Sequence, residues 1–295
     1  MEKHPAARSA ATEGAGQPAL SDRDFNKFSA FIYEVCGIKL PPIKKTMLSA
    51  RLQKRLRLLK ISSFSDYFDY VLSPEGQANE LYHMIDVVST NKTDFFREPP
   101  HFEVMNSRVL PELAARPGDR GHNRKLQVWS AGCSTGQEPY TLAMVLQEFC
   151  CKHPQLDYEI LATDISTQAL TAAGEAIYTD EVVAPVPTVL RHKYLMKGKG
   201  QQQGFHRVVP ELRQKVRFQR LNFMDRDFGL DRKMDIIFCR NVIIYFDRPT
   251  QQKLFEKFYR QFTPGGFLFT GHSESLEGIT DRMERIDSAV YRCLK

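Results

Sequence analysis

One stretch decides the fold of this 295-residue chain: Val128-Trp129-Ser130-Ala131-Gly132-Cys133-Ser134-Thr135-Gly136-Gln137-Glu138. It reads as a strand, then a turn with two glycines, then the first turn of a helix. Glycine lets the backbone approach a ligand closely, and a helix N-terminus favours anionic ligand groups. The next predicted strand ends at Asp164, 26 residues beyond Glu138, where a carboxylate can accept hydrogen bonds from ribose hydroxyls. The stretch therefore predicts a nucleoside-containing cofactor at the carboxyl edge of a parallel sheet.

A dinucleotide is the first alternative cofactor, and the charge at the turn argues against it. The dinucleotide fingerprint is G-x-G-x-x-G, but its middle glycine is absent here and Glu138 stands where a pyrophosphate would approach. A carboxylate there repels phosphate and attracts a cation. S-adenosylmethionine carries a ribose, an ammonium and a sulfonium but no phosphate, so the residues favour it over NAD.

A serine hydrolase is the second alternative. Gly132–Gly136 also fits the G-x-S-x-G nucleophile elbow, with Ser134 as the nucleophile and His272 as a base. That elbow normally follows several strands, whereas everything upstream here has helical patterning. The sequence contains no HGGG-like oxyanion segment, and several aspartates compete as the partner of His272. These features favour the methyl-donor cofactor and leave the hydrolase as a minor alternative.

Short apolar runs alternate with helical patterns from Leu126 to the C-terminus, which predicts a parallel sheet with helices on both faces. Strands are expected at Leu126–Ser130, Ile160–Thr163, Val216–Arg220, Met234–Cys239, Phe267–Thr270 and Val290–Leu294, and helices at Tyr140–Cys150, Thr167–Ala176 and Thr250–Phe262. Residues 180–210 interrupt this alternation. Three glycines there separate Lys193–Met196 from Phe205–Val209, which predicts a small inserted hairpin.

The first hundred residues have helical patterning and no strand signal. Residues 1–20 are rich in Ala, Gly and Pro and are expected to form a disordered tail. Capping boxes at Ser21 and at Ser63 open two helices, and further helices are expected at Lys44–Lys60 and Gln77–Val88. We therefore expect an all-helical domain over 21–90, a linker with a helix at His101–Ala115 over 91–125, and the sheet domain over 126–295.

The net charge of +6 comes from one segment of the chain. Between Glu34 and Asp66 there is no acidic residue, and subtracting the eight basic residues there from +6 leaves −2 for the rest. These eight are Lys39, Lys44, Lys45, Arg51, Lys54, Arg55, Arg57 and Lys60. No apolar run approaches the ~18–20 residues of a transmembrane helix. The six cysteines form no C-x-x-C pair, which suits a reducing cytoplasm, and no zinc site is expected.

Four motifs in this sequence resemble the chemotaxis receptor methyltransferases, the CheR family. They are Ser89–Arg97, Trp129–Tyr140, Phe238–Phe246 and Gly271–Glu274, and the likeness runs in matching order from about Ser21 to the C-terminus. The resemblance implies an α/β protein: a small all-helical N-terminal domain, then a Rossmann-like S-adenosylmethionine-dependent methyltransferase domain with a small inserted β-subdomain. It implies methylation of glutamate side chains of chemoreceptors, forming methyl esters for sensory adaptation. The expected location is the cytoplasm, at membrane receptor arrays.

The resemblance also implies a set of site residues. Those expected to bind the cofactor are Asn91, Thr93, Arg97, Gly132, Glu138, Asp164, Asn222, Phe223, Cys239, Arg240 and Asn241. Within this set, Glu138 is expected to take the ammonium or a nearby polar group, Asp164 the ribose, and Asn222 with Phe223 the adenine. The expected catalytic residues are Arg97, Arg240 and Tyr245, the product is S-adenosylhomocysteine, and no metal is expected. Gln137 stands where the family more commonly has Glu, so one charge is missing there.

The expected partner is the glutamate-bearing coiled coil of a chemoreceptor. The basic helix is the expected docking face, through Lys44, Lys45, Arg51, Lys54, Arg55 and Arg57. In some relatives the inserted subdomain binds the C-terminal pentapeptide of the receptor by strand addition, so residues 193–209 are a second docking candidate.

Two other functions remain as alternatives at this point. Nucleic-acid methylation is disfavoured because Arg240-Asn241-Val242-Ile243 stands where amino-methylating enzymes carry N/D-P-P-Y. A catalytically silent, cofactor-sensing adaptor is disfavoured by the intact set Asn91, Arg97, Asp164, Arg240 and Tyr245. Neither nucleic-acid binding nor membrane insertion is expected.

Overall fold

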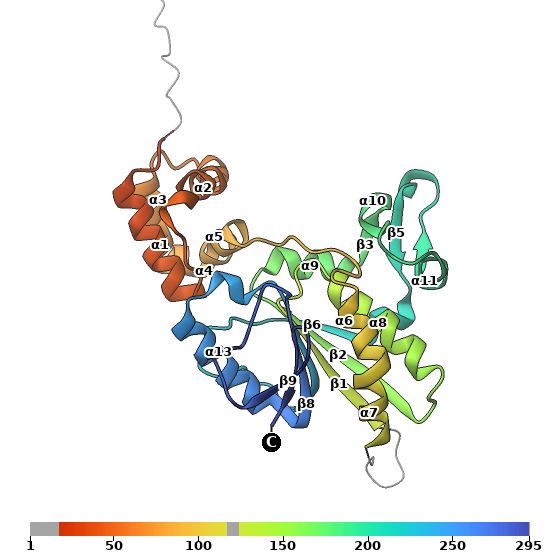
Figure 1. The fold of residues 1–295 in the computed structure, drawn as a ribbon. Helices are drawn as coiled ribbons and strands as arrows, with labels where there is room; N and C mark the ends of the chain where they lie inside the picture. Colours follow the sequence, from red (N-terminus) through yellow and green to blue (C-terminus); the bar gives the residue numbers. More distant parts are fainter. Residues whose placement is uncertain (1–17, 117–123, 295) are drawn as a thin grey trace, which may run out of the picture.

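The structure is a computed structural model that describes residues 18–116 and 124–294. A cluster of helices comes first along the chain and a large sheet with covering helices follows it, and residues 177–208, inserted within the second part, contain a small separate sheet (Figure 1). Most of the tail expected over 1–20 lies outside the described residues. Its last part is packed, because Leu20 is buried and the carbonyl of Pro18 accepts a hydrogen bond from Gln53 Nε2 at 3.1 Å.

The N-terminal part is all helical, as the sequence predicts. Its elements are α1 (Asp22–Cys36), η1 (Pro42–Lys44), α2 (Lys45–Leu59), α3 (Phe64–Leu72), α4 (Pro74–Asn79) and α5 (Leu81–Val88). Ser21 and Ser63 cap α1 and α3 by accepting the backbone N–H three residues on, and Gly37 ends α1 in the left-handed conformation. Leu48, Leu52 and Leu56 of α2 face the core of this part, as their spacing predicts.

The prediction of a single helix at Gln77–Val88 is wrong, because the helix is interrupted at Glu80, between α4 and α5. The carboxylate of Glu80 is buried and accepts hydrogen bonds from Arg55 Nε and Nη2, at 2.8 and 2.6 Å. The hydroxyl of Tyr67 donates to the same carboxylate at 2.7 Å. A helical pattern does not show that one acidic residue is buried against partners from two other helices.

The helix expected at His101–Ala115 has an irregular middle. It consists of α6 (Pro100–Val104), a π-helical turn, η2 (Met105–Val109), and α7 (Leu110–Ala115). Pro111 has no backbone N–H and cannot donate to the preceding turn, which is a known cause of such irregularity. In the part of the chain that the structure describes, no helix has the length and apolar character to cross a membrane.

A seven-stranded sheet in the order β6-β2-β1-β7-β8-β10-β9 forms the larger part of the molecule. Its strands are β1 (Arg124–Ala131), β2 (Leu156–Asp164), β6 (Val216–Arg220), β7 (Met234–Cys239), β8 (Phe262–Thr270), β9 (Met283–Asp287) and β10 (Val290–Cys293). Five strands are parallel, as expected, but β10 runs antiparallel to β8 and β9 antiparallel to β10. The sequence did not predict β9, because this edge strand is largely charged and exposed.

Helices cover both faces of this sheet, as predicted. Val128 and Ile236 pack with α6, α7 and α8 (Gln137–Cys150) on one face. Their neighbours Trp129 and Ile237 point the other way and pack against α13 (Arg248–Gln261). The alternation of side chains along each strand thus separates two cores. Helix α9 (Thr167–Glu175) follows β2, and η4 (Ile243–Tyr245) follows β7.

The predicted hairpin is present as part of a separate three-stranded sheet in the order β3-β5-β4. Strands β4 (Leu195–Lys197) and β5 (Phe205–Val208) are its antiparallel pair, and the short strand β3 (Ile177–Thr179) was not predicted. The helices α10 (Asp180–Val183), α11 (Thr188–Tyr194), η3 (Gly200–Gln202) and α12 (Pro210–Arg213) complete this region. Figure 1 shows it away from the N-terminal helices, at the other end of the molecule.

Candidate functional site

A pocket opens where the strand order of the large sheet reverses. Strand β1 pairs with β2 on one side and with β7 on the other, and ligands of open α/β sheets bind at the carboxyl ends of strands at such a switch point. The pocket has a volume of about 1200 Å³ including its open mouth. Of the residues expected at the site, it is lined by Asn91, Thr93, Arg97, Gly132, Glu138, Asp164, Asn222, Phe223, Arg240, Asn241 and Tyr245.

Cys239 is the expected cofactor residue that the structure places elsewhere. Its side chain is fully buried and packs in the core between β7 and α13. The alternation along β7 turns it away from the pocket, so the expectation of a cofactor contact is corrected. Burial also raises the pKa of its thiol well above the usual value, which keeps it protonated.

The floor of the pocket needs a glycine. Gly132 has φ of +86°, and a Cβ on it would lie 2.5 Å from Val242 Cγ2. Any side chain at this position would be strained and would also collide with the loop after β7. Gly132 thus allows the glycine turn to approach the loop after β7 closely, and both segments line the pocket.

Asp164 ends β2 with its carboxylate in the pocket wall. It accepts backbone N–H groups from Ser134 at 2.8 Å and from Ser166 at 2.9 Å. Burial raises its pKa, and these hydrogen bonds only partly oppose that shift. Each carboxylate oxygen has a second lone-pair direction, so the group can still accept from a ribose hydroxyl.

Ser134 does not have the surroundings of a catalytic nucleophile. Its hydroxyl donates to the carbonyl of Asn91 at 2.8 Å, and so joins the linker to the glycine turn. His272 lies instead beside His101, with ring centroids 4.6 Å apart, and is hydrogen-bonded through its backbone to Glu98. The two residues that the hydrolase interpretation pairs thus have other partners, and that interpretation fails.

Arg240 is the charged centre of the site. It follows β7 directly, its side chain is only 2% exposed, and its Nε lies 3.3 Å from Oε2 of Glu138. Its Nη2 donates to the carbonyl of Arg97 at 2.6 Å, while its buried Nη1 has no hydrogen-bond partner within the described residues. Glu138 is held from behind by the hydroxyl of Ser130 at 2.8 Å. Burial raises the pKa of Glu138, and Arg240 opposes this shift.

The N-terminal helices close one side of the pocket. Asn222, the expected adenine contact, donates from Nδ2 to the carbonyl of Val35 at 2.7 Å. The backbone N–H of Lys39 donates to the carbonyl of Tyr245 at 2.9 Å. These bonds tie the last turn of α1 and the segment after it to the sheet domain. Cys36, Ile38, Lys39, Leu40, Pro41, Lys44 and Met47 line the pocket from this side.

Two acidic residues important to the site were given no role from the sequence. Glu98 directly follows a predicted site residue, and its Oε2 lies 3.8 Å from Arg240 Nε. The buried carboxylate of Glu274 accepts backbone N–H groups from Asn241 at 2.8 Å, Gly271 at 2.6 Å and Ile244 at 3.3 Å. Glu274 lies in a motif that carries the family resemblance and Glu98 directly follows another, which was the signal available. Only the fold shows that they support the segment after β7.

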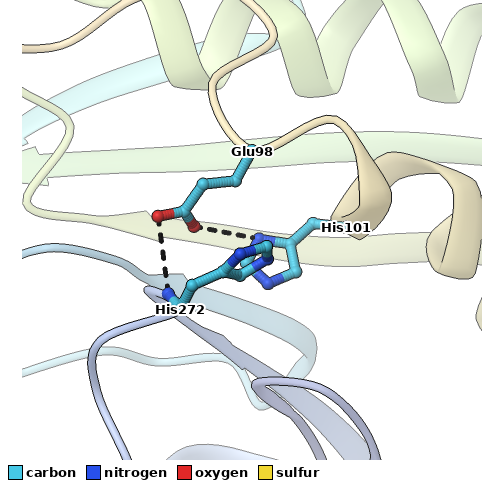
Figure 2. Close-up of side chains that lie close together, drawn as sticks. All are labelled: Glu98, His101 and His272. Carbon is cyan, nitrogen blue, oxygen red and sulfur yellow. Dashed lines mark hydrogen bonds and ion pairs between the residues drawn. The ribbon is translucent and has the colours of Figure 1, made fainter.

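Glu98, His101 and His272 form a polar cluster (Figure 2). Their ligand-type atoms lie within 4.8 Å of one another, and Nδ1 and Nε2 of buried His101 lack hydrogen-bond partners within the described residues. This donor set resembles that of a zinc site. Glu98 is, however, already the counter-ion of Arg240, whose charge opposes a further cation. The cluster fits a metal poorly for that reason.

The basic segment divides into two groups. Arg51 donates from Nη1 to the carbonyls of Val88 and Ser89, and Arg55 forms the ion pair with buried Glu80 at 2.6 Å. Lys45 pairs with Asp22 at 2.7 Å. The side chains of Arg51 and Arg55 thus hold the helices together, and docking through them stays a prediction. The exposed members of the segment are Lys39, Lys44, Lys54, Arg57 and Lys60.

The fold and the pocket together define an α/β protein that binds a nucleoside-containing cofactor, with the carboxylates of Glu138 and Asp164 in the pocket lining. Family comparison makes this specific. Residues 23–89 match the model described as "CheR methyltransferase, all-alpha domain", and residues 91–292 match "CheR methyltransferase, SAM binding domain". The chain belongs to the CheR methyltransferase family, and its larger part is an S-adenosylmethionine-binding methyltransferase domain.

Individual relatives agree over nearly the whole chain. A chemotaxis protein methyltransferase of Klebsiella aerogenes is 38% identical over 97% of this chain and 95% of its own length. One from Borreliella burgdorferi is 36% identical over 92% of this chain and 95% of its own length. Chemotaxis protein methyltransferase 2 of Pseudomonas aeruginosa is 36% identical over 91% and 92%.

Proposed function

We propose that this chain transfers the methyl group of S-adenosylmethionine to glutamate side chains of chemoreceptors, forming methyl esters in sensory adaptation of bacterial chemotaxis. The observation that carries the proposal is the convergence of Asp164, Glu138 and Arg240 in one pocket at the switch point of a chain of this family. The pocket is bounded by the basic N-terminal part, next to which an acidic protein substrate can dock.

The residues have distinct roles in this proposal. Asp164 accepts from the ribose, Asn222 and Phe223 hold the adenine, and Glu138 faces the ammonium. Gly132 allows the close approach, and the linker residues Asn91, Thr93 and Arg97, with Asn241 opposite, enclose the methionine part. The cofactor supplies a methyl group on a sulfonium and leaves as S-adenosylhomocysteine.

The acceptor needs no general base. A glutamate with a pKa near 4.3 is ~99% or more ionised at pH 7, so the carboxylate is already nucleophilic. The task of the protein is therefore to position the reacting groups and to exclude water. Tyr245 and Arg240 line the pocket and orient them, and Arg97 supports Arg240 through its carbonyl. Asn241 and η4 are fixed for this purpose by the carboxylate of Glu274.

Receptor docking would use the exposed basic residues. Lys39 and Lys44 lie at the pocket wall itself, and Lys54 and Arg57 are exposed on α2. A glutamate-bearing receptor coiled coil is the complementary partner. In this proposal the chain acts in the cytoplasm and is recruited to receptor arrays at the membrane.

The three-stranded sheet is a second docking candidate. Strand β4 pairs with β5 on one side and forms an edge of that sheet. An extended peptide such as a receptor C-terminal pentapeptide can add a strand to such an edge. Titration of the full chain with receptor tail peptides tests this, and absence of saturable binding would remove this part of the proposal.

The decisive experiment is incubation with methyl-labelled cofactor and chemoreceptor-containing membranes. Base-labile label on receptor glutamates is expected. Transfer of label to DNA or RNA without receptor labelling would replace the proposed substrate. Binding of cofactor without transfer to any acceptor would favour the sensing adaptor.

A further inference from the structure

Arg240 has two carboxylate partners, and only one of them lines the pocket. Oε2 of Glu138 lies 3.3 Å from Arg240 Nε and belongs to the pocket wall. Oε2 of Glu98 lies 3.8 Å from the same nitrogen, and this residue is absent from the pocket lining. With all three groups ionised, the trio carries a net charge of −1. Because Glu138 is the carboxylate in the pocket wall, the excess negative charge lies on the side that faces the pocket.

Glu98 is held in place by two other segments of the chain, the loops after β7 and β8. Its Oε1 accepts the backbone N–H of His272 at 3.4 Å and the side-chain amide of Asn241 at 3.5 Å. Its backbone has φ of +56°, a conformation that non-glycine residues seldom adopt and that tends to persist where surrounding contacts enforce it. The carboxylate is thereby fixed between Arg240 and the loops after β7 and β8.

The pKa of Glu98 supports its part in this distribution of charge. Burial alone would raise the pKa of Glu98, but Arg240, the His272 N–H and neighbouring groups together lower it. Glu98 therefore stays ionised at neutral pH and compensates Arg240. Without Glu98, Glu138 would be the only one of these two carboxylates left to compensate the positive charge of Arg240. The pair would then have no net negative charge to offer the cofactor.

We propose that Glu98 determines the selectivity of the pocket for a cationic methyl donor, because it neutralises Arg240 and so leaves the charge of Glu138 to the cofactor. Both forms of the cofactor carry the ammonium that faces Glu138, and they differ in charge at sulfur: S-adenosylmethionine is a sulfonium and S-adenosylhomocysteine a neutral thioether. The charge left to the cofactor therefore acts on the ammonium in both forms, and on a second cationic group only in S-adenosylmethionine. Glu98 is thus a specificity-determining residue that acts through Arg240. The inference rests on the proposed function only for the identity of the cofactor.

The test compares the affinities of both cofactor forms for the full chain by isothermal titration calorimetry. Glu98→Gln keeps the shape and an acceptor oxygen for His272 and Asn241 but removes the charge. We expect it to raise the Kd of S-adenosylmethionine about tenfold and that of S-adenosylhomocysteine by less than about threefold. Glu98→Ala is a second uncharged variant with the same expected ratio, and Glu98→Asp should retain the wild-type ratio because it keeps the charge.

Exposed Glu103, in the next helical turn, gives the matched control Glu103→Gln, for which both affinities should stay at wild-type values. A purely structural role of Glu98 would weaken both cofactor forms in parallel. Parallel weakening, or no change of the ratio in both uncharged variants, would overturn the inference. The titration needs no receptor. A failure of this inference can therefore be told apart from a failure of the proposed receptor methylation.

Discussion

Nε of Arg240 lies 3.3 Å from Oε2 of Glu138, which pairs the residue after β7 with the first turn of α8. The two residues are far apart in sequence and meet because β1 and β7 are neighbours in the sheet. A buried arginine between two carboxylates, Glu138 and Glu98, is fixed in position, and removing Arg240 would leave their buried negative charges uncompensated. The pair of Arg240 and Glu138 therefore fixes the position of the residue after β7 relative to the first turn of α8, and both lie in the pocket wall.

Tyr245 lies at the end of η4 and lines the pocket. Replacement by phenylalanine removes one hydroxyl and keeps the ring packing. We expect Tyr245→Phe to lower kcat for receptor methylation about 10- to 100-fold, because a positioning hydrogen bond is lost in the transition state. The Kd of S-adenosylhomocysteine should stay within about threefold of wild type. Near-normal turnover would exclude a catalytic role for this hydroxyl.

Asp164→Asn tests the cofactor end of the pocket. The carboxylate accepts N–H groups on both oxygens, so an amide nitrogen in its place must face one of these donors. We expect the Kd of S-adenosylhomocysteine to rise at least about tenfold, measured by calorimetry. Asp69→Asn, a change on the exposed surface of α3, is the matched control and should have no effect. Unchanged affinity in Asp164→Asn would show that the ribose binds elsewhere.

The docking face is tested by charge reversal at exposed residues. We expect Lys54→Glu with Arg57→Glu to raise the KM for receptor several-fold at low salt and less at high salt, because exposed charges are screened. The affinity for cofactor should be unaffected. Steady-state kinetics with receptor membranes measures both parameters.

Two further variants make this comparison specific. Lys152→Glu with Lys253→Glu carries the same charge change at exposed residues outside α2 and should leave the receptor KM unchanged. Arg55→Glu should instead lower the melting temperature, because it places a like charge against buried Glu80. If both double variants changed KM equally, α2 would have no special part in docking.

Much of the fold follows from local patterns. The capping serines, the apolar periodicity of α2 and the strand–turn–helix around Gly132 are each determined by neighbouring residues, and the structure has them where the sequence predicts them. The break at Glu80 and the roles of Glu98 and Glu274 depend on partners far along the chain. Arg51 and Arg55 show the same limit, since a count of charges does not show which ones are engaged within the fold.

His101 predicts how stability depends on pH. Its side chain is buried, and burial together with the charge of Arg240 lowers its pKa to about 4, with Glu98 opposing this only in part. In the unfolded chain the pKa is near 6.5, so between these values the unfolded state binds a proton that the folded state does not. The contribution to stability is therefore complete above pH ~6.5 and is lost as the pH falls towards 4, by roughly 3 kcal/mol over the window.

A His101→Gln variant has no such proton uptake. Its urea midpoint is expected to be lower than that of wild type at pH 7, and the gap between the two should narrow steadily at pH 6 and pH 5. Comparing the two proteins at each pH cancels the titration of every other group that the substitution leaves alone. His83→Gln, on α5, removes an exposed imidazole and should run parallel to wild type. A constant gap for His101→Gln would mean that the buried imidazole takes up its proton in the folded state as readily as in the unfolded one.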